Sequence, residues 1–362
     1  MITLFSFVLS WLRGNISIRI PKEFSILLAI FGIWAFLSGI IAMDHKFWYQ
    51  SIEWMLRSFI IFFLVYNSFS TKEEIEVVFK IIVLSIFLST FVSFSVFLGG
   101  FSISLKNILP LFTERFAGTI FDPNYFAMTV AASMPLAIVL TIKSERLLVK
   151  LFWTFAILFL IFAMIISQSR TGLFSIAIIF VYSIIYMIQK KRKEVFFLIV
   201  PVVTVILMLP AVFWYRISIF LQAMLAGTKG DVSMYQRLSL LQAASDVFIK
   251  NSIFGVGLGN FEVVAARYTQ YPMVCHNTYL EIAANLGLVG LIPFLGILYM
   301  GFTILKGALS NTHLSDLAWA VRAGLLGLYV SILFLSVPFK LDLWVFLALA
   351  GVLSCMNKQQ HV

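Results

Sequence analysis

Charged side chains are scarce in this sequence. Of its 362 residues, 12% are Asp, Glu, Lys or Arg, whereas soluble domains carry about 25%. Hydrophobic residues make up 61% of the chain, and the mean hydropathy is +1.02. A chain of this composition cannot cover itself with polar groups, so the sequence excludes a soluble globular domain and requires lipid as its main solvent.

Cysteine is also rare. The two cysteines, Cys275 and Cys355, lie in segments that we predict on opposite sides of the membrane, which excludes a disulfide between them. Neither cysteine has the spacing of metal ligands. Acidic residues that could hold Mg²⁺ or Mn²⁺ are scattered over the predicted outer loops, as Asp122, Asp231, Asp246 and Glu262. The sequence therefore predicts neither a metal site nor a cofactor.

Apolar runs of about twenty residues recur along nearly the whole chain, and a run of that length crosses a hydrocarbon core as an α-helix. The sequence predicts an all-α integral membrane protein with about ten transmembrane helices (nine to eleven), in a single membrane domain of residues 1–362. Residues 1–12 are short for a span, and we interpret them as an interfacial or partial helix. The predicted spans are residues 24–43, 48–69, 77–99, 119–141, 148–167, 171–188, 195–215, 278–305, 320–339 and 342–356.

Basic residues give the chain a net charge of +10. They form short clusters between the apolar runs rather than a stripe interleaved with aromatics, which argues against a nucleic-acid partner. With the N-terminus inside, the clusters at 13–22, 143–150 and 190–193 all fall in cytoplasmic connections. This is the distribution that the positive-inside rule predicts.

Two long connections are predicted on the extracytoplasmic side, residues 100–118 and residues 216–276. Loops of such length are uncommon unless they are functional. Within the larger loop, residues 233–249 have helical spacing, and we expect this helix to lie along the membrane surface. Its predicted apolar face comprises Leu238, Leu241, Ala244, Val247 and Phe248.

A polar break, SQSRTG at residues 167–172, joins two predicted spans at their outer ends. One interpretation is a tight turn in which Gly172 supplies backbone freedom and Arg170 reaches the lipid headgroups. The other is a functional site, because an arginine at membrane depth is costly.

A second polar motif begins with Arg115 and continues with DPNY at residues 122–125. Asp122 followed by Pro123 is an ordinary helix start. The functional alternative is an anion held by Arg115 beside that helix N-terminus, where exposed amides favour negative charge.

The third motif combines Arg237, the turn GVGLGN at residues 255–260, and His276 with Asn277 before the next span. The turn superficially resembles a dinucleotide fingerprint, but it lacks the final glycine and any βαβ context, so we reject a Rossmann site. His276 has two interpretations: a helix cap, or a general base for deprotonating a hydroxyl.

These residue types suit one reaction. Arginines at the outer leaflet would bind a pyrophosphate bidentately, and a histidine would activate an acceptor hydroxyl. Such a pair predicts group transfer from a pyrophosphate-linked lipid, with the leaving group stabilised by arginine rather than by metal.

Taken together, the motifs resemble the bacterial O-antigen ligase and O-antigen polymerase family. The resemblance spans residues 115–290 and is carried by Arg115 with Gly118, DPN at 122–124, SRTG at 169–172, Arg237, FGVGLGNF at 254–261, HNTYL at 276–280 and GLVG at 287–290. The flanking helices match only in hydrophobicity.

The resemblance implies a multi-pass glycosyltransferase of the bacterial cytoplasmic (inner) membrane, with its active site facing the periplasm or cell exterior. Its donor would be an undecaprenyl-pyrophosphate-linked glycan, and its acceptor a lipid A core sugar for a ligase or another repeat unit for a polymerase. By position, Arg170 and Arg237 would grip the pyrophosphate and His276 would be the base. Arg115 and Asn124 would add substrate contacts.

The match around Arg237 and His276 favours a ligase-like enzyme, and a repeat-unit polymerase is the first alternative. A transporter or flippase for a lipid-linked glycan is the second. It would require paired ionisable residues or interrupted helices near the bilayer midplane. The predicted span interiors are largely free of charge, since Arg57 and Lys80 are placed near span ends.

Overall fold

The computed structural model describes residues 18–19, 21–97, 115–120, 122–190, 232–269 and 273–359. These parts contain α-helices and short 3₁₀ helices but no strand, and seven of their helices are long and apolar enough to cross a membrane. The prediction of an all-α, multi-pass membrane protein is confirmed, whereas the number of spans stays a prediction. Residues 1–12 and 195–215 lie outside the described residues.

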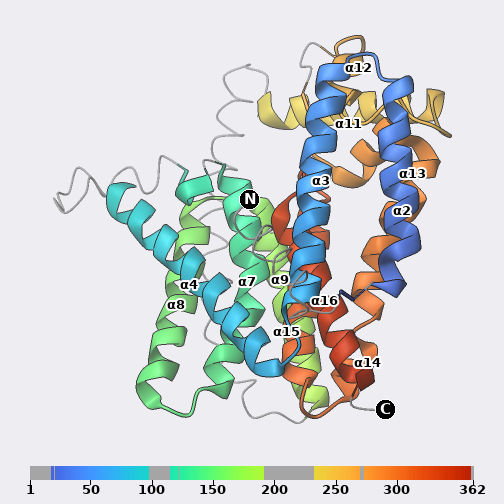
Figure 1. Ribbon diagram of the computed structural model, residues 1–362. Helices are drawn as coiled ribbons and strands as arrows, with labels where there is room; N and C mark the ends of the chain where they lie inside the picture. Colours follow the sequence, from blue (N-terminus) through green and yellow to red (C-terminus); the bar gives the residue numbers. More distant parts are fainter. Residues whose placement is uncertain are drawn as a thin grey trace. The chain divides into compact units, whose positions relative to one another are not determined.

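The helices fall into two compact units (Figure 1), and each is described by itself. Unit 1 comprises residues 1–74, 233–318 and 332–362, and unit 2 comprises residues 75–232 and 319–331. Unit 1 holds α2 (Lys22–Leu37), η1 (Ser38–Ile40), α3 (His45–Ser68), α11 (Val232–Lys250), α12 (Phe261–Ala265), α13 (Thr278–Thr303), α14 (Lys306–Ser310) and α16 (Leu341–Gln359). Unit 2 holds α4 (Lys72–Phe97), η2 (Gly118–Ile120), α7 (Pro123–Lys143), α8 (Leu147–Ile166), α9 (Arg170–Gln189) and most of α15 (Ser315–Ser331).

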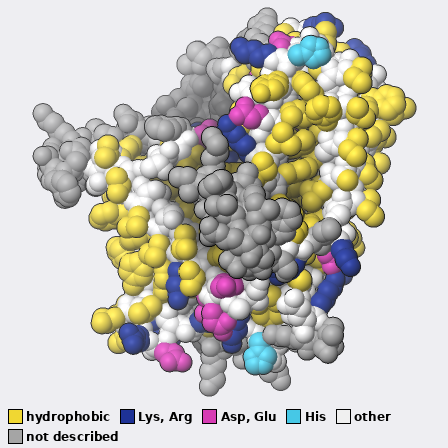
Figure 2. Space-filling view, viewed as in Figure 1, with side chains coloured by type: hydrophobic (Ala, Val, Ile, Leu, Met, Phe, Trp, Pro, Cys, Tyr) yellow, Lys and Arg dark blue, Asp and Glu magenta, His cyan; other side chains and the backbone are white. Residues whose placement is uncertain are grey.

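In unit 1, α13 packs on α2, and α16 packs on α3. Aromatic rings fill these contacts: Phe31 lies 5.8 Å from Phe294 between ring centroids, and Phe59 lies 4.9 Å from Trp344. The outward face of α2 is apolar and exposed, with Ile26 71% and Ile33 61% accessible. Apolar side chains cover the face of α2 that Figure 2 shows, as lipid contact requires.

Polar contacts join several helix ends in unit 1. Arg19 donates from Nη2 to the carbonyls of Tyr66 (2.8 Å) and Phe69 (2.5 Å) at the end of α3. Lys358 of α16 forms an ion pair with Glu23 of α2. Helices α2, α3 and α16 therefore share one polar end.

In unit 2, α7 is the central helix, and it packs against both α8 and α9. Nearly all of its residues from Phe126 to Thr141 are buried. An ion pair between Lys143 and Glu76 joins its far end to the first turn of α4. A helix buried on all sides can position the groups at its start.

The span interiors were predicted to be largely free of charge, and the placement of Arg57 near a span end was wrong. Arg57 lies in the middle of α3 rather than near its end, where it pairs with Glu53 one turn earlier. Arg322 lies inside α15 and hydrogen bonds the side chain of Tyr182 on α9. Each of these charges has a partner, which lowers the cost of keeping it among apolar helices.

The predicted span 320–339 was also misplaced, because α15 ends at Ser331. Residues 332–340 continue the apolar run but form an irregular turn whose backbone groups bond to the start of α13. Hydropathy cannot separate such a packed turn from a helix.

Candidate functional site

Polar groups gather where α7 and α9 begin in unit 2. The guanidinium of Arg115 donates from Nη2 to Asn124 Oδ1 at 3.0 Å and from Nε to the Ser167 carbonyl at 3.2 Å. Ser169 Oγ donates to the same Asn124 oxygen at 3.0 Å. The structure thus joins Arg115, Asn124 and the turn before α9 into one hydrogen-bonded cluster.

Arg170 is the first residue of α9, and its side chain is exposed. A cation at a helix N-terminus is unfavourable, since the helix dipole is positive there. Ser169, the N-cap of α9, is a neutral side chain that accepts from Gly172 N at 3.3 Å. Asp122 instead caps α7 by accepting from Asn124 N (2.7 Å) and Tyr125 N (3.0 Å). The start of α9 is therefore the end suited to an anion.

Gly172 has a different role from the one that the sequence suggested. It lies within α9 in ordinary helical conformation, so it supplies no turn freedom. A Cβ at this position would overlap the Cβ of Ala127 on α7. The missing side chain lets the two helix starts approach closely.

His276 of unit 1 has the backbone angle φ +57°, in the left-handed region. This conformation costs a non-glycine residue about 1–2 kcal/mol. The helix cap is the next residue, Asn277, whose Oδ1 accepts from Leu280 N at 2.9 Å. The interpretation of His276 as a mere cap is thus wrong, and its strained geometry requires support from neighbours.

Thr278 supplies that support. Its backbone N–H donates to Ile332 O at 2.9 Å, and its hydroxyl donates to Leu335 O at 2.6 Å. The same hydroxyl accepts from Val337 N at 2.9 Å. These three bonds clamp the start of α13 to the irregular turn 332–340 and fix the backbone of the neighbouring His276.

A carboxyl group that the sequence analysis missed lies beside this turn. Glu281 Oε2 is 4.0 Å from Cys275 Sγ, and Glu281 also hydrogen bonds Ser336. Burial, and then the charge of Glu281, raise the pKa of the Cys275 thiol, which therefore stays protonated and unreactive. The signal for Glu281 was present in the sequence, as an acidic residue in the first turn of an apolar helix.

Arg237 lies on α11, one turn before Leu240. Leu240, Ala244 and Val247 continue the same helical face and are buried in a cluster with Cys275 and Ala284. Arg237 therefore extends the face that packs beside the His276 turn. The predicted apolar face of α11 was partly wrong, since Leu238 is 58% exposed.

The glycine turn at 255–260 packs against a break in α13. Gly287 interrupts α13 with φ +61° and ψ −162°. A Cβ on Gly255 would overlap the Asn285 carbonyl, and a Cβ on Gly287 would overlap the Ile253 carbonyl. Both glycines are therefore required by close backbone contact as well as by positive φ.

Five backbone groups at the break form hydrogen bonds outside α13. The carbonyls of residues 284, 285 and 286 accept from Val256 N (3.1 Å), Gly257 N (2.9 Å) and Trp34 Nε1 (2.8 Å). The N–H groups of Leu288 and Val289 donate to Ser252 O (2.8 Å) and Ile253 O (3.2 Å). Irregular backbone is tolerated at membrane depth only when it is satisfied in this way.

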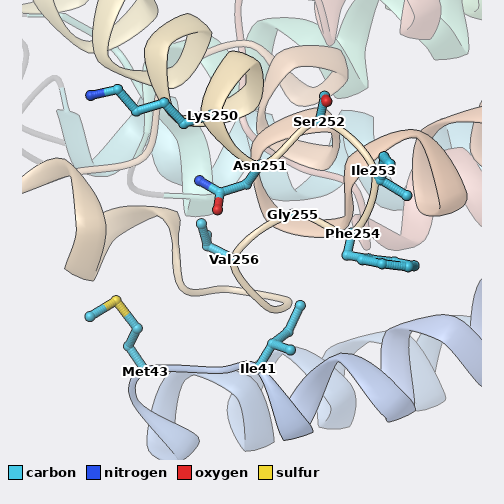
Figure 3. Close-up of a pocket in the computed structure, with 9 residues that line it drawn as sticks. All are labelled: Ile41, Met43, Lys250, Asn251, Ser252, Ile253, Phe254, Gly255 and Val256. Carbon is cyan, nitrogen blue, oxygen red and sulfur yellow. The ribbon is translucent and has the colours of Figure 1, made fainter.

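A pocket of about 510 Å³ lies beside this turn, between residues 250–256 and the connection that carries Ile41 and Met43 (Figure 3). Neither Arg237 nor His276 lines it. Among the residues that the structure describes, no three His, Cys, Asp or Glu side chains lie together as a metal site would need.

The five predicted site residues thus form two groups. Arg115, Asn124 and Arg170 surround the starts of α7 and α9, and Arg237 and His276 flank the packed cluster of α11 and α13. Residues 155–295 match the model of the O-antigen ligase family. The resemblance to the O-antigen ligase and polymerase family is therefore confirmed. The matched segment contains Arg170, Arg237 and His276 but not Arg115 or Asn124.

The match to this family model supports a function as a membrane enzyme that transfers glycans, of the ligase or polymerase type. No curated protein matches the chain.

Proposed function

We propose that this O-antigen ligase-type protein transfers a glycan from undecaprenyl pyrophosphate to an acceptor hydroxyl on the extracytoplasmic side of the bacterial cytoplasmic membrane. The observation that carries the proposal is the placement of Arg170. Helix α9 begins with a cation at its positive end, beside Arg115, inside the family-matched segment. A pyrophosphate would be stabilised there by both the helix N-terminus and the two guanidinium groups.

The reaction assigns one role to each group. His276 takes the proton of the acceptor hydroxyl, whose oxygen bonds to the anomeric carbon of the donor glycan. The bond from that carbon to the pyrophosphate oxygen breaks, and undecaprenyl pyrophosphate leaves with the electron pair. Arg170 and Arg237 stabilise the charge on the leaving group, and Arg115 with Asn124 adds contacts to the pyrophosphate or the sugar.

The acceptor of a ligase-like enzyme is a lipid A core sugar, and a polymerase would instead use a second repeat unit. The donor half of the reaction is the same in both cases.

A transporter of lipid-linked glycans is the competing function, and the break in α13 is the feature that favours it. However, the backbone groups at the break are occupied by Trp34 and the 252–257 turn. They are therefore not available to coordinate an ion or substrate, and the enzyme explains more of the polar residues.

The deciding experiment incubates the purified protein with an undecaprenyl-pyrophosphate glycan and either a lipid A core or a second repeat unit, with and without EDTA. We expect release of undecaprenyl pyrophosphate with the lipid A core acceptor, unaffected by EDTA. Release with the repeat unit alone would establish a polymerase. A strict need for Mn²⁺ or Mg²⁺ would count against arginine as the stabiliser of the leaving group.

The control for the proposed base is a second histidine. His276→Ala should abolish release, while His313→Ala, at an exposed position before α15, should leave it unchanged. Equal turnover in both variants would remove His276 from the mechanism.

A further inference from the structure

Phenylalanine rings line the facing sides of α4 and α8 in unit 2, where α4 crosses α8 (Figure 1). The residues recur every three or four positions, so each set lies along one face of its helix. They are Phe87, Phe91, Phe94 and Phe97 on α4, and Phe152, Phe155, Phe159 and Phe162 on α8. Rings from the two helices interlock: Phe87 lies 5.5 Å from Phe159, and Phe94 lies 5.8 Å from Phe162. We call this set the phenylalanine stripe.

The stripe ends at the polar cluster of the candidate site. Phe94 and Phe97 contact the ring of Phe116 with centroid distances of 6.0 and 5.5 Å, and Phe116 contacts Phe126 at 5.2 Å. Phe116 follows Arg115 directly, and Phe126 lies two residues after Asn124. A continuous chain of ring contacts therefore joins the stripe to the proposed pyrophosphate site.

Packing between the two helices accounts for only part of the stripe. Phe87 and Phe116 are buried, with 8% and 2% exposure, and form its floor. Phe91, Phe155 and Phe162 remain 51%, 55% and 46% exposed. These half-exposed rings offer contact area to a further apolar molecule.

On α4, the stripe covers the part of the helix that ends beside Phe116. From Phe87 to the end of α4 at Phe97 are ten residues, about 15 Å at 1.5 Å per residue. This length is about half of a 30 Å hydrocarbon core. The cluster of Arg115 and Arg170 lies at the Phe97 and Phe162 end of the stripe, where the head of an outer-leaflet amphiphile would be.

We propose that the phenylalanine stripe binds the polyprenyl chain of the donor while the Arg115 and Arg170 cluster holds its pyrophosphate. This inference rests on the proposed function and adds the site for the lipid part of the substrate. A polyprenyl chain carries a double bond in each unit, and fixed aromatic rings give it a large contact area at a low cost in side-chain entropy. The continuity of the stripe with a cationic site selects an anionic, long-chain amphiphile over bulk lipid.

The test compares two donors that carry the same glycan, one on a C55 prenyl pyrophosphate and one on a C5 prenyl pyrophosphate, whose single isoprene unit is too short to run along the stripe. The variant Phe91→Ala/Phe162→Ala removes two half-exposed rings and leaves the buried floor intact. We expect its KM for the C55 donor to rise about tenfold, with KM for the C5 donor and kcat unchanged. Phe36→Ala, which removes an exposed phenylalanine of α2 in unit 1, should change neither KM.

A second measurement does not depend on turnover. A C55 pyrophosphate with a diazirine in its prenyl chain is photo-cross-linked to the parent protein, and the labelled peptides are identified by mass spectrometry. Label within residues 87–97 and 152–162 is expected. Label elsewhere, or an unchanged C55 to C5 ratio of KM in the double variant, overturns the inference while turnover by the parent still upholds the glycosyltransferase. If the parent transfers neither glycan, the proposed function fails, and the position of the label alone decides on the stripe.

Discussion

The starts of α9 and α13 are built alike but hold their functional side chains differently. Each helix is preceded by a residue with positive φ, Gln168 at +52° and His276 at +57°, and is capped by the next side chain. In α9 the residue of interest, Arg170, follows the cap in relaxed helical geometry. In α13 the residue of interest, His276, precedes the cap and is itself strained.

The two helix starts show two ways in which a functional side chain can lower the stability of the fold. Arg170 costs stability through the electrostatic field of the helix, which an arriving anion reverses. His276 costs stability through its backbone, which only packing and the Thr278 bonds compensate. We therefore expect both residues to trade stability against function, by different mechanisms.

The largest expected effect comes from His276. Both His276→Ala and His276→Gly should lose transfer by about 1,000-fold, because each removes the base. Glycine adopts positive φ without strain, so the glycine variant should be about 1 kcal/mol more stable than the alanine variant. Turnover measurements check the loss of transfer, and thermal unfolding in detergent checks the difference in stability. Equal stability of the two variants would show that the left-handed turn is not strained.

Replacing Arg170 should reduce activity by less. Arg170→Gln should lower kcat/KM for the donor about 100-fold and raise the unfolding free energy by about 0.3–1 kcal/mol, because a cation leaves the helix N-terminus. The matched control is Arg146→Gln at the N-cap of α8. It should gain similar stability and keep full activity. A loss of activity in the control would show that any arginine at a helix start has this effect.

The clamp at Thr278 gives a smaller effect. Thr278→Val removes the hydroxyl that bonds Leu335 and Val337, and should lower kcat about tenfold by loosening the position of His276. The donor KM should not change, and Thr278→Ser should restore kcat. Thr303→Val, whose hydroxyl bonds only within its own helix turn, serves as the control. A change in KM with constant kcat would assign Thr278 to binding instead.

The smallest effect on turnover is expected at Gly172. Gly172→Ala should destabilise the protein by about 1–3 kcal/mol, because the new methyl group overlaps Ala127. Transfer should fall only a few-fold. Adding Ala127→Gly should restore the unfolding temperature. Failure of that rescue would indicate that the α7 and α9 starts are not held together by this contact.

Much of the helical framework followed from local sequence signals. The surface helix expected at residues 233–249 is α11, Val232–Lys250, and the cap residues Asp122 and Ser169 lie directly before their helices. Apolar periodicity, proline at a first turn and short polar side chains act within a few residues. These local signals predicted which residues belong to the motifs, but they did not predict which residues those motifs contact.

The remaining features depend on contacts between distant residues. The break at Gly287 is stable only because Trp34 and the 252–257 turn satisfy its backbone, and apolar periodicity continues through it. The same holds for the end of α15, where the turn 332–340 is as apolar as a span. Glu281 was missed because its neighbour Ser336 comes from a segment 55 residues later. The five site residues stay predictions as functional groups.

The break in α13 also bears on how the chain is made. Unsatisfied peptide groups in lipid cost several kcal/mol each. The segment around Gly287 is therefore unstable in the bilayer until its hydrogen-bond partners are present. Its partners, Trp34 and the glycine turn, both precede α13 in the sequence and emerge first from the ribosome. Trp34 and the 252–257 turn are thus synthesised before the segment around Gly287 whose backbone groups they bond.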